Sequence, residues 1–360
     1  MEERILKRTA LTVMAAAIAA CILVPALPYI LKAADALAVA MEDEQTKEEK
    51  KKRKMSGVEL LEYNNGKAEE EWEKDALLAD GLRLELPLGV TGNDLEVAGD
   101  YLTQTVTVSI PYAGESYLYD YPMLGQNDIM ESIDFESQKK YGILKMKMNQ
   151  VYELNTSYNE DYFYIEFLTP HEVYDKVIVI DAGHGGEDFG VVKMGISEKD
   201  IDLDIVLKLK EIFDEANDTS VGVYYTRTTD TDLDAQIRKR LARKTNADFF
   251  VSVHNSSTQS GMMSSIHGTQ VMYDETVEGS QRLAQIFQKE ITDILESSDK
   301  GIRPAEEADD FGDCGVPAVQ IEVGFMTNQA ELASLCSQEY QKKAAQGIYQ
   351  ALLAAIKETD

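Results

Sequence analysis

The stretch Lys176-Val-Ile-Val-Ile-Asp-Ala-Gly-His-Gly-Gly186 decides the fold of the C-terminal half of the chain. It begins as a continuous apolar run, which is typical of a strand buried on both faces of a parallel sheet. It ends in a loop where glycines lie on both sides of His184, and glycine lets a backbone turn sharply and approach a ligand closely. We therefore expect a buried strand that delivers a histidine to the edge of a sheet.

Beyond this strand, apolar strands alternate with amphipathic helices. Apolar residues recur every four positions over residues 201–213 and 233–241, which predicts two helices. Further strands are expected at residues 221–226, 248–253, 268–273 and 316–323, and further helices at 280–295 and 338–356. This alternation predicts an α/β domain over residues 173–360, with a mainly parallel, twisted sheet flanked by helices.

The region before this domain, residues 76–172, has a different pattern. Short stretches rich in β-favouring residues alternate with period two and are separated by Gly, Asn and Asp. They lie at residues 82–86, 105–110, 142–148 and 162–168. We expect a small all-β, sandwich-like accessory domain that serves in binding or spacing.

The N-terminal residues 1–40 have the order of a secretory signal. Lys7 and Arg8 precede an almost uncharged run over residues 9–31, and small residues follow in Ala36-Leu-Ala-Val-Ala40. The apolar run is nearly long enough to span a bilayer, so an uncleaved membrane anchor is the alternative. Either reading places the rest of the chain outside the cytoplasm.

Residues 41–75 are dominated by Glu and Lys and contain few apolar side chains. Such a segment cannot bury much surface, so we interpret it as a charged linker, either a tether or a solvated helix.

The strongly acidic composition argues against nucleic acid as a partner. The chain has 35 basic and 64 acidic side chains, and its net charge of −29 would repel nucleic acid. It would also repel an anionic wall polymer, so any attachment to a wall must use shape and hydrogen bonds.

The two cysteines of the expected folded part have more than one possible role. Cys314 and Cys336 could form a disulfide or be small core residues, and Cys314 could also bind metal. We expect a monomer.

Two of the four histidines follow the carboxyl ends of expected strands. His184 comes three residues after the end of the first strand, and His254 directly follows the strand at 248–253. Ligands of open α/β sheets bind at the carboxyl ends of the strands. The sequence therefore predicts that both imidazoles face one site.

Glu198 is the candidate carboxylate for this site. It stands fourteen residues after His184, at the start of the expected helix, with Ser197 as N-cap and Asp200 completing a capping box. The positive end of the helix dipole keeps such a carboxylate ionised, and Glu198 could also serve only the helix start. Two imidazoles and a carboxylate are the ligand set of hydrolytic Zn²⁺ sites.

A general base is expected at Glu322. This acidic residue lies near the carboxyl end of the apolar strand at 316–323, where burial without a partner would be costly. It could be a satisfied carboxylate of the core. As a base it would take a proton from water and return it to a leaving amine.

Five motifs in this order resemble the zinc-dependent N-acetylmuramoyl-L-alanine amidases, which hydrolyse bacterial peptidoglycan. They are Val177-Ile-Val-Ile-Asp-Ala-Gly-His-Gly-Gly-Glu-Asp-Phe-Gly190, Ser197-Glu-Lys-Asp200, Tyr225-Thr-Arg-Thr-Thr-Asp230, Val251-Ser-Val-His254 and Ile321-Glu-Val-Gly-Phe-Met-Thr-Asn328. The resemblance covers about half the chain, from Lys176 to the C-terminus. It implies that Zn²⁺ is the cofactor, with His184, Glu198 and His254 as ligands and Glu322 as the catalytic residue.

Residues around these motifs are expected to bind substrate or to support the ligands. They are Asp181, Asp188, Arg227 and Asn255. The sequence departs from the family at Ala182, where proline is usual, and at Asn255-Ser-Ser257, where a small residue and asparagine are common, but neither departure removes an expected ligand or the base. Some relatives carry an inhibitory insertion; residues 273–301 here hold a single helix of core pattern, so we expect no such plug.

The β-rich region resembles, without a sharp motif, the wall-targeting AMIN-like domains of some relatives. Two other functions use the same residues. A zinc peptidase could have an identical site, because the metal chemistry does not specify which amide is cut. A membrane-tethered wall-binding protein without turnover is the second alternative, although such a protein would not need Glu322.

Overall fold

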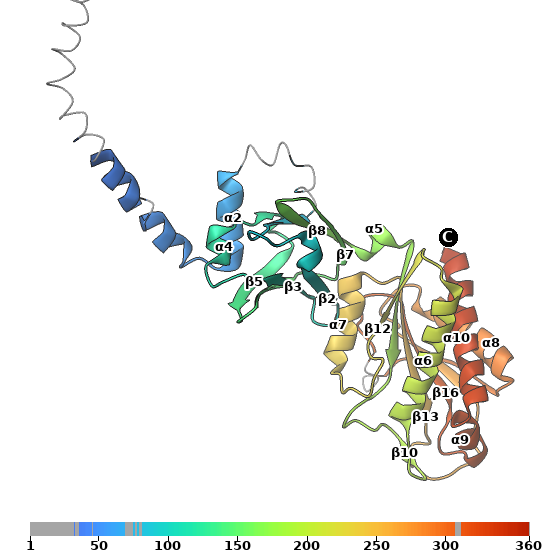
Figure 1. The fold of residues 1–360 in the computed structure, drawn as a ribbon. Helices are drawn as coiled ribbons and strands as arrows, with labels where there is room; N and C mark the ends of the chain where they lie inside the picture. The colour runs from blue at the N-terminus through green and yellow to red at the C-terminus, as the bar shows by residue number, and fades with distance from the viewer. Residues whose placement is uncertain are drawn as a thin grey trace, which may run out of the picture.

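The computed structural model describes residues 32, 36–44, 46–68, 75, 78, 81–306 and 311–359. The first half of the described chain forms a β-rich module and the second half an α/β domain (Figure 1). In the α/β domain, the hairpin of β10 (Val192–Lys193) and β11 (Ile196–Ser197) lies at the end farthest from the module.

The α/β domain is built on a sheet with the strand order β12-β9-β13-β16-β14-β15 in the described residues. Its strands are β9 (Lys176–Ala182), β12 (Val221–Tyr225), β13 (Phe249–Ser256), β14 (Thr269–Tyr273), β15 (Asp299–Pro304) and β16 (Ala318–Phe325). All neighbouring pairs are parallel except β14 with β16. The mainly parallel sheet is thus confirmed, and β15 is an additional edge strand that the sequence pattern did not predict.

Helices cover both faces of this sheet (Figure 1). They are α6 (Glu198–Ala216), α7 (Ala235–Thr245), α8 (Ser280–Leu295), α9 (Gln329–Leu335) and α10 (Gln338–Thr359). Ile178 and Ile180 of β9 pack in the core beneath α6, α8 and α10, whereas Val177 and Val179 pack with α7 on the other face. Burial on both faces explains the continuous apolar run.

The β-rich module is a sandwich of two antiparallel sheets, with orders β4-β1-β8-β7 and β2-β3-β6-β5. The strands are β1 (Gly81–Glu85), β2 (Glu96–Asp100), β3 (Thr105–Pro111), β4 (Leu124–Gly125), β5 (Met130–Ser137), β6 (Tyr141–Met148), β7 (Glu153–Tyr158) and β8 (Tyr162–Leu168). Short helical turns are η2 (Gly92–Asp94), α4 (Tyr117–Asp120) and α5 (Pro170–Val173). Apolar side chains of both sheets share one core, as the sandwich prediction requires.

One helix extends this module beyond its expected boundary. α2 (Gly57–Lys67) begins at a capping box of Ser56 and Glu59, and it buries Leu60 and Leu61 in the core of the sandwich. The prediction of a charged linker up to residue 75 is wrong for this segment. Its charged residues are frequent enough to hide the two adjacent leucines that anchor it.

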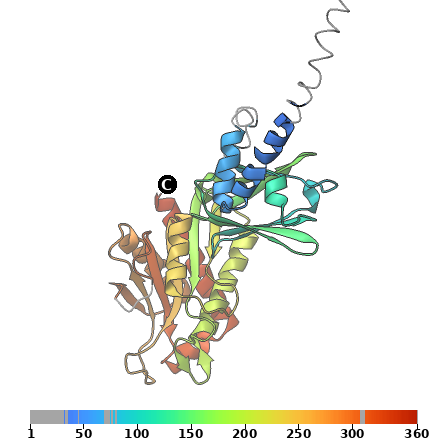
Figure 2. The ribbon, with the colours of Figure 1, turned by 90° about the vertical axis from the view of Figure 1, so that its left-hand side faces the viewer.

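The module contacts the α/β domain beside the edge strand β12 (Figure 2). The Tyr101 hydroxyl donates to the carbonyl of Tyr225 at 2.9 Å, and the Tyr224 hydroxyl donates to Glu153 at 2.5 Å. The rings of Tyr101 and Tyr224 meet edge to face. Val151 of the module joins the core on the α7 side of the sheet.

The apolar run at residues 9–31 of the expected signal or anchor lies outside the described residues. Among the helices that the structure describes, none combines the length and the hydropathy needed to cross a membrane. Cys314 is buried and Cys336 exposed, and both are free thiols.

Candidate metal centre

Three neighbouring strands and one helix bring the predicted ligands and base together. His184 follows β9, His254 lies in β13, Glu322 lies in β16, and Glu198 is the first residue of α6. His254 and Glu322 stand directly opposite each other in the register of β13 and β16. The expectation that these side chains share one end of the sheet is correct.

The loop that carries His184 depends on glycine at its closest approach. A Cβ atom on Gly183 would lie 2.3 Å from Cε1 of His254, so no larger residue fits there. His184 itself has φ of 56°, in the left-handed region that is strained for most residues with a side chain. Its backbone is held by Arg238, which donates to the His184 carbonyl at 2.7 Å.

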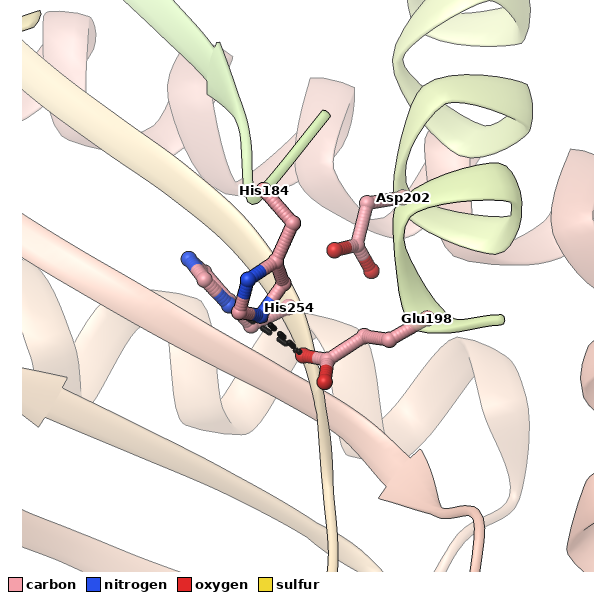
Figure 3. Close-up of side chains that lie close together, drawn as sticks. All are labelled: His184, Glu198, Asp202 and His254. Atoms are coloured by element: carbon pink, nitrogen blue, oxygen red, sulfur yellow. Dashed lines mark hydrogen bonds and ion pairs between the residues drawn. The ribbon is translucent and has the colours of Figure 1, made fainter. Parts of the chain in front are cut away.

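Both imidazoles point at the same carboxylate oxygen (Figure 3). Nε2 of His184 lies 3.3 Å and Nδ1 of His254 lies 3.2 Å from Oε1 of Glu198. Donor atoms that share a tetrahedral ion at about 2.0 Å lie about 3.3 Å apart, so these separations fit a common Zn²⁺ ligand set. The two nitrogens and one oxygen are also the donors that Zn²⁺ prefers at hydrolytic sites.

Asp188 orients His184 from the side away from Glu198. Its Oδ2 accepts a hydrogen bond from Nδ1 of His184 at 2.7 Å, and its Oδ1 accepts from the Gly190 amide at 3.0 Å. A carboxylate on the far nitrogen fixes the tautomer and leaves Nε2 free to bind a metal. Burial disfavours the imidazolium, but hydrogen bonds and charges of Glu198 and Asp188 outweigh burial and raise the pKa of His184 to about 9.

Glu198 is fixed on both of its oxygens. Oε1 accepts from the backbone amide of Asn255 at 3.0 Å, and Oε2 accepts from that of Val191 at 2.8 Å. Burial favours the neutral acid, yet the hydrogen bonds of His184 and His254 hold the pKa of this carboxyl well below its usual range. Glu198 is therefore an anion that faces both imidazoles.

The start of α6 differs from the predicted capping box. Ser197 is the N-cap, but its side chain makes no capping hydrogen bond. The amide groups of Glu198 and Lys199 donate instead to the carbonyls of Val191 and Phe189 in the preceding loop. Because these backbone contacts satisfy the first N–H groups of the helix, a side-chain cap is not needed.

Glu322 lines an open cleft of about 410 Å³ together with His184, Glu198 and His254. The side-chain amide of Gln320, two residues earlier on the same face of β16, donates to Oε1 of Glu322 at 3.0 Å. Gln320 also lines the cleft, although the sequence pattern did not single it out. Its position two residues before Glu322 on one strand face was the available signal.

Two of the other expected residues, Asp181 and Arg227, stabilise the strand ends and loops next to the predicted ligands. Asp181 is buried and accepts from Thr226 and Ser252 at 2.6 Å each, and it pairs with Arg238 at 2.6 Å. These hydrogen bonds join Asp181 to residues of β13, α7 and the end of β12, so it stabilises the strand ends.

Arg227 is also buried and donates to the carbonyls of Ala182, Gly183 and Lys199. It braces the loops on either side of the site. Arg227 is not among the described residues that line the cleft.

Asn255 lines the cleft, and its side-chain amide donates to Oδ1 of Asp202 at 2.7 Å. Asp202 is fully buried one helical turn after Glu198 and belongs to the same group of potential metal-binding side chains as His184, Glu198 and His254. Burial, with the charge of Glu198, raises the pKa of Asp202 well above its usual range. Asp202 was not among the expected site residues, although its spacing of four from Glu198 places it on the same helix face.

Comparison with known proteins identifies relatives over the α/β domain. Residues 178–354 match the family described as N-acetylmuramoyl-L-alanine amidase. The uncharacterized protein YqiI of Bacillus subtilis is 35% identical over 177 residues, which are 48% of this chain and 81% of that protein. The germination-specific N-acetylmuramoyl-L-alanine amidase of the same organism is 28% identical over 51% of this chain and 81% of its own length.

A solved structure is also similar. The catalytic domain of CwlV, an N-acetylmuramoyl-L-alanine amidase from Bacillus (Paenibacillus) polymyxa var. colistinus, is 32% identical. The match covers 51% of this chain and 98% of that one, with a TM-score of 0.47.

Proposed function

Because the chain belongs to the N-acetylmuramoyl-L-alanine amidase family, we propose that it cuts peptidoglycan at the amide bond between N-acetylmuramic acid and L-alanine of the stem peptide. In this proposal His184, Glu198 and His254 hold Zn²⁺, and Glu322 is the general base. Peptidoglycan lies outside the cytoplasmic membrane, so the enzyme acts there.

The observation that carries the proposal is the convergence of both imidazoles on one oxygen of Glu198, in an open cleft that Glu322 also lines. Zn²⁺ held by His184, Glu198 and His254 would supply Lewis-acid chemistry and would acidify water at the site. The remaining chemistry belongs to side chains that are already positioned.

Glu322 moves the proton in this reaction. Its carboxylate takes a proton from the water whose oxygen attacks the carbonyl carbon of the lactyl group. When the carbon–nitrogen bond breaks, Glu322 returns the proton to the nitrogen of L-alanine, which leaves as an amine. The hydrogen bond from Gln320 orients the carboxylate for both transfers.

The surrounding residues keep the ligands in place during turnover. Asp188 holds the ring of His184, and the amide groups of Val191 and Asn255 hold Glu198. Arg227 and Arg238 secure the backbone on both sides of His184. Because the ligands and Glu322 are already held in place, less free energy is needed to bring the reacting groups into position.

We also propose that residues 173–360 are the catalytic domain and that the β module binds or positions the cell wall. Two features favour this division: each half has its own apolar core, and the cleft lies on residues of the second half alone.

Mass spectrometry of purified peptidoglycan digested by the full chain tests the proposal. We expect intact stem peptides that begin with a free L-alanine amine, and glycan that keeps the lactyl carboxyl group. Peptides cut at internal bonds would instead identify a peptidase. Wall binding without any new ends would identify a non-catalytic binder.

A further inference from the structure

The β module carries an open hollow on its surface that the proposed chemistry does not use. Its volume is about 500 Å³, within the range of sites that hold a small ligand. The described residues that line it come from the loop between β1 and β2, the start of β2, and the paired ends of β3 and β6 with their neighbouring residues. The cleft of the metal centre is lined by residues of the other half of the chain, so the two sites are distinct.

Two tyrosine side chains line this hollow. Tyr112 directly follows β3 and is 82% exposed, and Tyr141 is the first residue of β6 and is 45% exposed. The Tyr112 amide donates to the carbonyl of Lys140 at 2.9 Å, and Pro111 stands opposite Tyr141 in the strand register. The backbone therefore holds the two tyrosines next to each other. Each ring offers an apolar face to a ligand, with a hydroxyl group at its wet end.

A strained backbone presents Tyr112 to solvent. Its φ is 59°, in the left-handed region where a bulky side chain is an outlier. Glycine would adopt this conformation freely, and the ring packs in none of the apolar cores, so the fold does not require tyrosine here. Among the other described non-glycine residues with a positive φ, only His184 of the metal centre carries an aromatic ring. Such strain gathers at sites that bind ligands, which points to a function for the Tyr112 ring.

The charged groups of the hollow favour a ligand without negative charge. Asp94 and Glu96 contribute two exposed carboxylates, and Lys140 contributes one ammonium group. The amide and the hydroxyl of Thr91 donate to Oδ2 of Asp94 at 2.8 Å and 2.7 Å, which fixes this carboxylate. An excess of negative charge repels anionic polymers, whereas carboxylate oxygens accept hydrogen bonds from hydroxyl groups. A sugar fits this lining, because its rings combine an apolar C–H face with a rim of hydroxyl groups.

We propose that this hollow binds the glycan strand of peptidoglycan. Tyr112 and Tyr141 pack against the faces of the sugar rings, and Asp94 and Glu96 accept hydrogen bonds from hydroxyl or N-acetyl N–H groups. The inference rests on the proposed function, in which the module binds the wall and the other half cuts it. The hollow then holds the enzyme on the glycan while the cleft acts on the stem peptide.

Four variants of the full, Zn²⁺-loaded chain test this site. Tyr112→Gly removes the ring together with the backbone strain, Tyr112→Phe keeps the ring, and Tyr141→Ala removes the second ring. Leu88→Ala is the matched control, because Leu88 is 99% exposed and directly precedes Gly89 of the hollow, but does not line it. Thermal melts report on folding. Tyr112→Gly should melt no earlier than the wild-type chain, since glycine relieves the strained φ.

Binding is measured by titration calorimetry with chitotetraose, an uncharged oligomer of N-acetylglucosamine. It resembles the wall glycan but carries no stem peptide, so the amidase reaction does not consume it. We expect Tyr112→Gly and Tyr141→Ala to bind chitotetraose at least about fivefold more weakly than the wild-type chain. Tyr112→Phe and Leu88→Ala should bind like the wild-type chain. Because the hollow is separate from the cleft, all four variants should hydrolyse a soluble muropeptide at the wild-type rate.

The proposal is overturned if the wild-type chain does not bind chitotetraose, or if folded Tyr112→Gly and Tyr141→Ala bind it as tightly as the wild-type chain. If either variant is misfolded, the other decides. Equal losses in both variants and in Leu88→Ala would also overturn it, because they would show a general effect of surface apolarity. Sugar binding without any hydrolysis of the muropeptide would contradict the proposed function instead, so the two failures are distinguishable.

Discussion

At the scale of single residues, a proton and a metal ion compete for Nε2 of His184. Glu198 and Asp188 raise the pKa of His184 to about 9, above its ordinary value of 6.5. A raised pKa means that the proton stabilises the metal-free fold. This contribution is complete below about pH 6.5 and is lost as the pH rises through about 9.

The affinity for Zn²⁺ should therefore depend on pH. We expect it to increase about tenfold per pH unit between about 6.5 and 9, because His184 must lose one proton for each ion bound. Asp188→Asn removes one of the two carboxylates that hold the proton, so its rise should end at a lower pH. Competition with a chelator across this range measures both proteins. A flat affinity in the wild-type chain would contradict the assignment of His184.

At the scale of elements, the segment from β9 to α6 is shaped around the ligands. Gly190 has φ of 61°, and a Cβ there would lie 2.5 Å from Cδ2 of His184 and 2.8 Å from Oε2 of Glu198. Gly195, in the turn between β10 and β11, has φ of 80° with no heavy atom within 4 Å of such a Cβ. The two glycines share the backbone requirement but differ in what surrounds them.

Alanine substitutions at Gly190 and Gly195 should separate the effect of backbone strain from the effect of contact with His184 and Glu198. Both substitutions cost about 1–2 kcal/mol because the residue must adopt a left-handed conformation. Only Gly190→Ala pushes on His184 and Glu198, so we expect it to weaken Zn²⁺ binding by more than about tenfold, whereas Gly195→Ala binds normally. Chelator competition and thermal melts of both variants test this. Equal effects on binding would mean that the contact is unimportant.

The sequence predicts the strands and the helix around the site only in part. Apolar periodicity located β9, β13, β16 and α6, and the carboxyl-end rule brought His184 and His254 together. Periodicity marks which residues are buried, but it does not show which buried polar atoms meet. For that reason Asp202 and Gln320 were missed and the capping box at Ser197 was wrong. The leucines of α2 were assigned to a linker for another reason, because charged residues dominate the segment around them.

At the scale of the whole molecule, two cores are nearly independent. One core draws its buried side chains from residues 60–167 and another from residues 178–355. The contacts of Tyr101, Val151 and Glu153 join the halves beside β12 and α7, and none of these residues lines the cleft. Chemistry and wall recognition should therefore be separable.

A fragment of residues 173–360 should fold and keep its Zn²⁺. We expect it to hydrolyse a soluble muropeptide as fast as the full chain does, but to sediment less with insoluble wall. Its Tm should be lower, because removal of the module exposes apolar surface around Tyr224. Steady-state kinetics, a pull-down with purified wall and thermal melts check the three expectations. A folded fragment without activity would show that the module completes the site.

The most direct test of the account combines metal analysis with wall digestion in the full chain and its Glu322→Gln, His184→Ala and His254→Ala variants. We predict one Zn²⁺ per wild-type chain and an unchanged Zn²⁺ content in Glu322→Gln, with hydrolysis reduced about 10²- to 10⁴-fold. The two histidine variants should lose both metal and hydrolysis. Wild-type activity in Glu322→Gln, or full Zn²⁺ content in both histidine variants, would contradict the account.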